Sequence, residues 1–231
     1  MLELDAIEAR SGSFTLTADF GIEAGARVAI IGASGSGKST LLDVIAGFLK
    51  PRSGHVLWKD ADLTDLAPAR RPVSVLFQDT NLFPHLTIER NLALALNPRS
   101  GTLRKGDAAR IEDALARVGL AGFAPRRPSE MSGGQQSRAA LARVLLQDRP
   151  VLLLDEPFAA LGPALKVDML DMVAKVADAE ALTVLLVTHD PADARRFADQ
   201  TLLVENGIVG TPQPTQALLD DPPESLRTYL G

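Results

Sequence analysis

Short apolar runs alternate with helical patterns along the 231 residues of this chain. The runs are rich in Val, Ile and Leu, as buried parallel strands are, and they cover Val28–Ile31, Val73–Phe77, Val151–Leu154 and Thr183–Val187. Helical patterns lie between most of them, at Lys38–Phe48, Asp107–Val118 and Ala164–Ala179. This alternation predicts an α/β fold in which ligands bind at the carboxyl ends of the strands.

The middle of the chain departs from this alternation. From about His85 to Gln147 it carries several helix signals without a convincing strand, which predicts a helical insertion between two halves of the sheet. We therefore expect one domain over residues 1–231, with a core lobe formed by 1–84 and 148–231 and a helical subdomain at 85–147. Four prolines near the end predict short turns and one brief helix there; they are Pro212, Pro214, Pro222 and Pro223.

The composition of the chain excludes several classes of protein. Hydrophobic residues make up 46% of the chain and charged residues 23%, as in an ordinary globular protein. The net charge of −5, without a long basic run, argues against a nucleic-acid partner. The chain has no Cys, which excludes disulfides and thiolate metal sites. Its apolar stretches are too short to span a bilayer, and its first residues lack a signal peptide's layout, so we expect it to remain in the cytoplasm.

A glycine-rich loop follows the first apolar run and opens the first helical pattern. It has the spacing of a phosphate-binding loop, and this strand-to-helix context is the one that the motif requires. Backbone N–H groups at a helix N-terminus bind phosphate, the lysine adds charge near the outer phosphates, and Ser39 is the expected protein ligand to Mg²⁺. The predicted nucleotide-binding residues here are Gly32, Ala33, Ser34, Gly35, Ser36, Gly37, Lys38, Ser39 and Thr40.

Two adjacent acids end the Val151–Leu154 run. Successive side chains of a strand point to opposite faces, so Asp155 and Glu156 diverge. Asp155 is expected to face Mg²⁺ through water, and Glu156 to orient and deprotonate the water that attacks the outer phosphate. The alternative is a pair of acids that cap the following turn.

Three further motifs give the chain a family resemblance. Met131-Ser132-Gly133-Gly134-Gln135 closely resembles the signature of the ABC ATPases, Gln78 resembles their Q-loop glutamine, and His189 their switch histidine. Together with the phosphate loop and the paired acids they stand in the family's order. The resemblance implies a mostly parallel P-loop NTPase core with an N-terminal antiparallel part and an inserted helical subdomain. His55 and His85 are interpreted as surface or core residues without a catalytic role.

The resemblance also implies cofactors and partners. ATP with Mg²⁺ would bind the phosphate loop, with Ser39, Gln78 and Asp155 around the metal and with Glu156, His189 and Gln78 as catalytic residues. The signature residues Ser132, Gly133, Gly134 and Gln135 of a second copy would cover the same ATP. Transmembrane permease subunits, and indirectly a solute-binding protein, complete the assembly at the cytoplasmic face of the bacterial inner membrane.

Two positions depart from the family pattern. The aromatic residue that usually stacks on adenine is missing around Ile7–Ser13, which leaves Phe14 or Arg10 as substitutes or as plain packing and surface residues. Gly162 stands where the family has an Asp that bridges the dimer. The absence of this Asp either weakens communication between two ATP sites or removes one polar contact.

Two segments indicate a kind of transporter. Phe77–Thr87 resembles the family's docking segment for membrane subunits, and at least one of Leu82, Phe83 and Leu86 is expected to dock there. Arg71–Gln78 with Asn91–Pro98 looks most like the ATPase of bacterial thiamine and thiamine pyrophosphate importers, and the short C-terminus agrees with that subgroup. The alternatives are another small-solute importer, a non-transport ABC protein and a small-molecule kinase.

Overall fold

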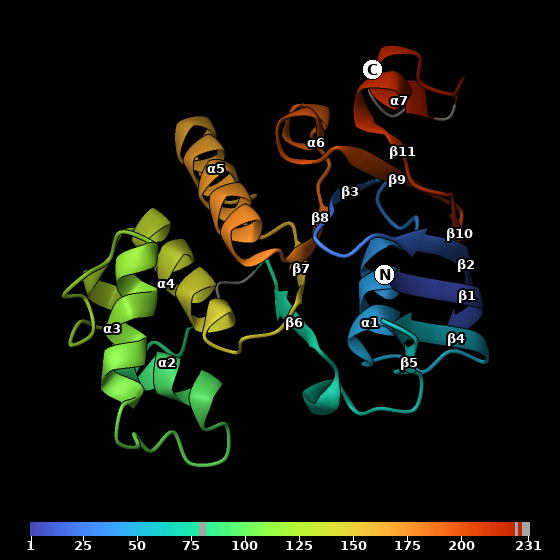
Figure 1. Ribbon diagram of the computed structural model, residues 1–231. Coiled ribbons are helices and arrows are strands. Elements are labelled where there is room, and N and C mark those ends of the chain that lie inside the picture. The colour runs from blue at the N-terminus through green and yellow to red at the C-terminus, as the bar shows by residue number, and fades with distance from the viewer. Residues whose placement is uncertain (79–81, 225, 228–231) are drawn as a thin grey trace. The chain divides into compact units, whose positions relative to one another are not determined.

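The chain folds into two compact units in a computed structural model that describes residues 1–78, 82–224, 226 and 227 (Figure 1). The first unit comprises Met1–Val73, Pro150–Glu156 and Val173–Gly231, and the second comprises Ser74–Arg149 and Pro157–Met172. The long helix α5 (Pro163–Glu180) is divided between them. No helix in these described ranges is both long and apolar enough to cross a membrane.

A parallel sheet forms the centre of the first unit. β3 pairs in parallel with β8 and with β9, and β8 pairs in parallel with β7. The bounds are Arg27–Ile31 for β3, Val151–Asp155 for β7, Thr183–Val187 for β8 and Gln200–Glu205 for β9. β7 and β8 are almost wholly buried, because both faces of a parallel sheet are covered. The predicted runs therefore match β3, β7 and β8 to within one residue at each end, whereas β9 was not predicted.

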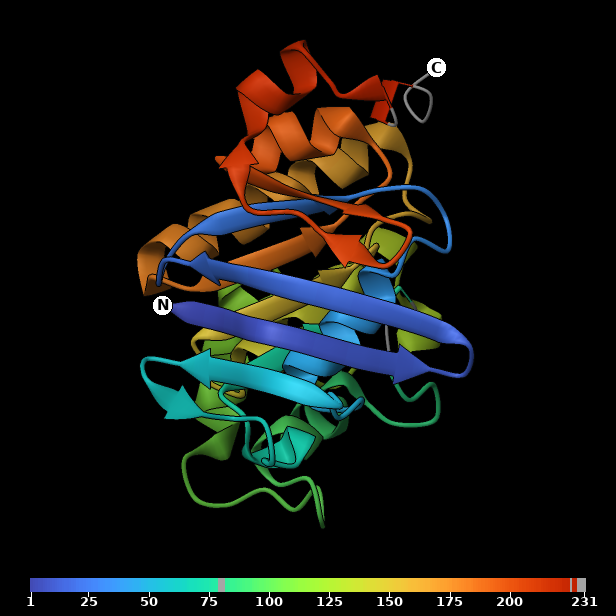
Figure 2. The same cartoon turned by 90° about the vertical axis from the view of Figure 1, so that its right-hand side faces the viewer.

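An antiparallel layer extends this sheet at the N-terminal part of the chain. In Figure 2, β1 and β2 lie side by side with β4, and α1 (Lys38–Ala46) lies behind them. Their bounds are Leu2–Ser11 for β1, Phe14–Ile22 for β2 and Ser53–Trp58 for β4, and β5 at Ala61–Asp62 pairs with β4. β10 (Ile208–Val209) joins β2 to β9. The expected N-terminal antiparallel part is thus present.

The helix α1 is shorter than its sequence pattern predicts. It ends at Ala46 instead of Phe48 because Gly47 takes a left-handed conformation, with φ 85°, and its N–H donates to the carbonyl of Asp43. A buried guanidinium supports this end: Arg71 donates to the carbonyls of Val44 (2.8 Å) and Ile45 (2.9 Å). A cation on helix C-terminal carbonyls complements the helix dipole, so the C-terminal end of the helix that carries Lys38 is fixed.

Three helices pack together in the second unit. They are α2 (Ile88–Leu96), α3 (Asp107–Arg117) and α4 (Gly133–Leu145), and each packs against the other two. The only strand residues described here belong to β6 (Val73–Leu76), as expected for a helical insertion. The compact units nonetheless differ from the predicted lobes, since the second one starts at Ser74 and includes Pro157–Met172. The boundaries 85–147 stay a prediction.

The C-terminal part holds more regular structure than its prolines predict. Besides the expected brief helix α7 (Thr215–Asp220), it contains β9, β10 and β11 (Gln213–Pro214), and α6 (Pro191–Phe197) comes just before β9. β11 pairs antiparallel with β9. Pro214 ends its short strand and leads into α7, a place where the missing N–H costs little.

Candidate functional site

Glycines shape the phosphate loop where it passes close to its neighbours. A Cβ on Gly32 would lie 2.2 Å from the carbonyl oxygen of Val204, and one on Gly37 would lie 2.9 Å from the side chains of Phe14 and Leu16. Gly37, with φ 114°, also precedes the first turn of α1. The loop therefore closes tightly over the strands and brings the N-terminus of α1 to the surface of the site, as phosphate binding requires.

Lys38 places its ammonium inside this loop. Its Nζ donates to the carbonyl oxygens of Gly32 (2.7 Å) and Ala33 (2.8 Å), and the side chain is buried. Burial lowers the pKa of Lys38, while the carboxylates of Glu156 and Asp155 oppose that change. The loop, one cation and two carboxylates thus share a single cluster of charges.

Asp155 and Ser39 form an oxygen pair beside Lys38. Asp155 ends β7, and burial raises the pKa of its carboxyl group against the opposing effects of the Ser39 hydrogen bond and the Lys38 charge. Hydroxyl and carboxylate oxygens are the donors that Mg²⁺ prefers, and Mg²⁺ commonly binds through one or two protein groups together with phosphates and water. The pair fits such an ion. Within the described ranges no three His, Asp or Glu side chains gather as a metal site.

The backbone turns at Glu156, directly after the end of β7. The φ of 45° at this residue lies in the left-handed region, which is rare for a residue with a Cβ. The N–H of Glu156 donates to the carbonyl of Val187 (3.2 Å), and its Oε2 lies 3.0 Å from Nδ1 of His189. The structure therefore brings the predicted catalytic carboxylate and the predicted switch histidine into direct contact, and strain at such a residue is typical of functional sites.

Lys38, Ser39, Glu156 and His189 line one cavity of about 770 Å³. That volume suits a nucleotide-sized ligand. Its lining includes Ser34, Gly35, Gly37, Lys38, Ser39, Thr40, Glu156 and His189. Ser11 and Phe14 also line the cavity. Ser11 was not predicted as a site residue from the sequence. Phe14 was predicted as one of two substitutes for the adenine-stacking residue. Gly32, Ala33 and Ser36 line a separate hollow of about 190 Å³ with β9.

The signature residues begin α4 in the second unit. Ser132 caps the helix by accepting from the N–H of Gln135 (3.3 Å), and the Gln135 side chain accepts from the N–H of Ser132 (3.0 Å). Ser132 and Gly133 are exposed. A Cβ on Gly133 or Gly134 would find only ordinary contacts, at 3.9 Å and 3.5 Å, with Leu161 and Leu165. The chain's own packing does not require glycine at either position.

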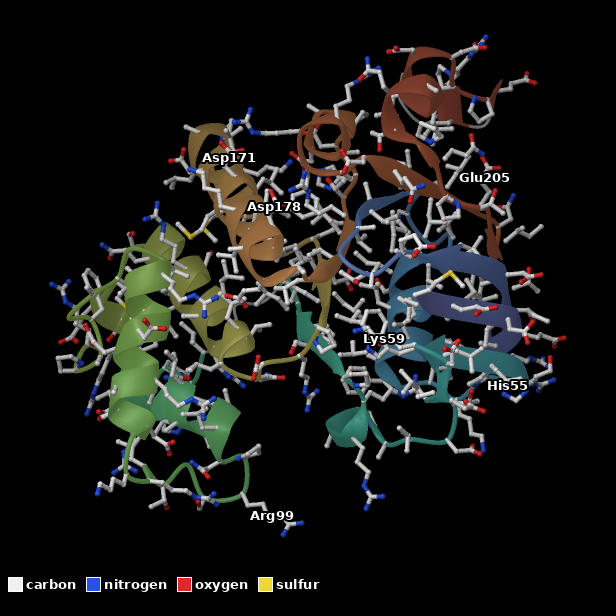
Figure 3. The ribbon with its side chains drawn as sticks, viewed as in Figure 1. His55, Lys59, Arg99, Asp171, Asp178 and Glu205 are labelled. Carbon is white, nitrogen blue, oxygen red and sulfur yellow. The ribbon has the colours of Figure 1, made fainter. Side chains whose placement is uncertain are left out.

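Other predicted residues fall at different places. Gln78 is exposed in the second unit, so its role beside the metal stays a prediction. A Cβ on Gly162 would meet no heavy atom of the described residues within 4 Å. His55 lies on the outside of β4 (Figure 3) and pairs with Asp62 at 2.9 Å, while the ring of His85 lies against Phe83. Residues 79–81 of the expected docking segment lie outside the described residues.

Comparison with known proteins agrees with this geometry. A family model described as ABC transporter matches residues 16–159. The thiamine import ATP-binding protein ThiQ of Cereibacter sphaeroides is 59% identical, and that of a Ruegeria species is 55% identical, each alignment covering 100% of both chains. The dimeric ATP-binding cassette MJ0796, solved with ADP and Pi, superposes with a TM-score of 0.78 at 30% identity over 93% of this chain and 99% of its own. The chain therefore belongs to the ABC transporter family.

Proposed function

We propose that this chain binds and hydrolyses ATP as the cytoplasmic subunit of a bacterial importer for thiamine or thiamine pyrophosphate. The observation that carries the chemistry is a single cavity that joins Lys38 and the phosphate loop to Glu156 and His189. The solute is inferred from the curated relatives, which are named as thiamine import proteins over the full length of the chain.

Each group has a task in hydrolysis in this proposal. The loop N–H groups and Lys38 bind the phosphates, and Ser39 and Asp155 hold Mg²⁺, which neutralises charge on the phosphate oxygens when bound. Glu156 orients and deprotonates the attacking water. His189, 3.0 Å from Glu156, keeps the carboxylate in position and can donate to the outer phosphate. The carboxylate and the imidazole thus act as one unit.

The second copy of the chain supplies the rest of the site in this proposal. The capped N-terminus of α4 presents backbone N–H groups from its exposed first turn, where the helix dipole favours negative charge. Gly133 and Gly134 have room for a side chain in the isolated fold. We therefore attribute their small size to close contact with a ligand or a partner. An ATP-dependent homodimer follows.

Removing the Lys38 ammonium tests the phosphate site. Lys38→Ala is expected to weaken ATP binding about 10- to 150-fold, the effect of losing a charge-assisted hydrogen bond of roughly 1.5–3 kcal/mol. Isothermal titration of the full chain with ATP measures it. Lys50→Ala is the control, since Lys50 pairs with Asp65 at the surface and should leave affinity unchanged. Equal affinities for the Lys38→Ala and unaltered chains would exclude the loop as the nucleotide site.

A groove in the second unit is the proposed docking site for the membrane subunits. Its volume is about 380 Å³, and Leu82, Phe83 and Phe77 line it. Phe83 is 43% exposed, its ring faces the Arg143 guanidinium at 5.6 Å, and its N–H donates to the buried side chain of Asn91 (2.7 Å). A fixed, exposed aromatic ring beside a cation is typical of interface anchors. Leu86 does not line the groove.

A charge in this groove should weaken docking. Phe83→Asp is expected to reduce binding to the permease subunits about 30-fold or more, since buried aromatic anchors contribute about 2 kcal/mol or more. The amount of chain retained on vesicles that contain the co-expressed permease measures it. Ile208→Asp is the control, because Ile208 is an exposed apolar residue of the first unit. Equal retention of both variants would show that the docking site lies outside this groove.

Uptake identifies the solute. In a bacterium that lacks its own thiamine import ATPase, the chain, expressed with the permease and binding protein encoded beside it, should restore uptake of radiolabelled thiamine, and Lys38→Ala should not. If the chain instead restores uptake of a different small solute, the proposed ATPase activity stands and the chain belongs to another importer.

A further inference from the structure

The residue before His189 is held by three hydrogen bonds within the first unit. Thr188 is 4% exposed, and its N–H donates to the carbonyl of Ile30 (3.2 Å), which continues the pairing of β8 with β3. Its hydroxyl donates to Oδ2 of Asp193 (2.6 Å) and accepts from the N–H of Asp190 (3.1 Å). Donor and acceptor capacity of the Thr188 hydroxyl are thus both used.

The partner carboxylate is itself fixed. Asp193 lies in the first turn of α6, is 7% exposed, and its N–H donates to the carbonyl of Asp190 (3.1 Å). The Asp190 side chain caps the same helix by accepting from the N–H of Ala192 (2.9 Å). A closed set of hydrogen bonds therefore encloses the backbone on both sides of His189, and it joins the end of β8 to the start of α6.

The His189 ring depends on this backbone for its direction. Its side chain is 57% exposed, against 28% for its partner Glu156, so close packing does little to orient the ring. The 3.0 Å contact between Nδ1 of His189 and Oε2 of Glu156 requires the backbone at 188–190 to keep its conformation. A displacement of about 1 Å at a catalytic group is enough to cost roughly 100-fold in rate.

From these contacts we propose that Thr188 and Asp193 are a positioning pair, which holds the loop of His189 so that the imidazole meets Glu156. The inference rests on the catalytic role proposed for His189 and extends it to two buried residues that do not line the nucleotide cavity. The Thr188 hydroxyl is the essential group. Removal of this hydroxyl leaves the buried Asp193 carboxylate without the Thr188 donor, and it leaves the N–H of Asp190 without the Thr188 acceptor.

The test separates positioning from folding. Thr188→Val keeps the shape of the side chain and removes the hydroxyl, and it is expected to lower kcat for ATP hydrolysis by about 10- to 100-fold while the KM for ATP stays within about 3-fold. Thr188→Ser restores the hydroxyl and should return kcat to within about 3-fold of the unaltered chain. Asp193→Asn, which keeps an acceptor oxygen of the same shape, should give an intermediate kcat.

Thr201→Val is the matched control. Thr201 is also a fully buried threonine of the first unit, and its hydroxyl is hydrogen-bonded to that of Thr215 (2.9 Å). Both valine variants should lower the urea midpoint of unfolding to a similar extent, but only Thr188→Val should lower kcat. Equal losses of kcat in the two variants would overturn the proposal, because they would reflect stability alone. Failure of Thr188→Ser to recover would overturn it as well.

His189→Ala distinguishes this inference from the function on which it rests. If His189→Ala is slow and Thr188→Val is not, the positioning role is wrong and the role of His189 stands. If His189→Ala hydrolyses ATP at the normal rate, the catalytic role of His189 is wrong and the pair has nothing to position. Slow turnover in both, with recovery in Thr188→Ser, supports the proposal.

Discussion

Glu156→Gln is expected to bind ATP as the unaltered chain does and to hydrolyse it about 10²- to 10⁴-fold more slowly, which is the usual contribution of a general base. That loss corresponds to about 3–5 kcal/mol of activation free energy. The amide keeps the size of the carboxylate and can still contact Nδ1 of His189, which lies 3.0 Å from Oε2. It cannot accept the proton of the attacking water, so the substitution should slow hydrolysis without weakening ATP binding.

Single-turnover hydrolysis of radiolabelled ATP measures this rate, and titration with ATP measures the affinity. Glu8→Gln is the matched control, because Glu8 is an exposed carboxylate on β1 that does not line the cavity. The role of Glu156 would be wrong if Glu156→Gln turned over ATP as fast as Glu8→Gln. Equal losses in rate and in affinity would instead make Glu156 a binding residue.

The backbone at Glu156 explains why its direction was only partly predictable. Alternation along a strand predicts that two adjacent acids diverge, and of the two only Glu156 lines the cavity. The sequence carries no signal that Glu156 takes φ 45°, a conformation that costs about 1–2 kcal/mol for a residue with a Cβ. The pairing of its N–H with Val187 and of its carboxylate with His189 holds that conformation, and both partners are distant in sequence.

The buried strands were predictable because Val, Ile and Leu make up most of each run. β8 matches its apolar run, and β7 extends one residue beyond it, at the Asp155 carboxyl. β9 was missed, since its run of apolar residues is short and bounded by Gln200 and Glu205. In β1 the alternation of buried residues shifts between Leu4 and Ile7, where the pairing register also shifts. A bulge of this kind hides the period of two on which strand prediction depends.

The site was predictable where a motif sets both residue type and spacing. The glycine loop, Lys38 and the paired acids are of this kind. Part of the loop, Lys38 and Glu156 line one cavity, and the Asp155 carboxylate is close enough to Lys38 to affect its pKa. Phe14 reaches the same cavity from the start of β2, but its approach to Gly37 depends on how the strands pack. The contact of Thr188 with Asp193 likewise depends on the turn that joins β8 to α6.

The two glycines of α4 support the proposal that a second copy completes the site. Gly133 and Gly134 are the first two residues of the helix, and a Cβ on either would meet no described atom closer than 3.5 Å. The packing of the chain therefore does not require glycine at these positions. Their small size is explained if another molecule approaches this backbone closely, as the proposed homodimer requires.

Gly133→Ala, placed in the Glu156→Gln background, is therefore expected to prevent the ATP-dependent dimer while leaving the fold as stable or slightly more stable. An extra methyl group in a tight contact costs about 1–3 kcal/mol, and a symmetric dimer carries it twice, which weakens association by about 30-fold to 10⁴-fold. Light scattering with and without Mg-ATP measures the mass. Gly210→Ala is the control, since its Cβ would meet only a carbonyl at 3.4 Å in the first unit. If the Gly133→Ala chain dimerises with ATP as the control does, the signature does not contact the partner's nucleotide.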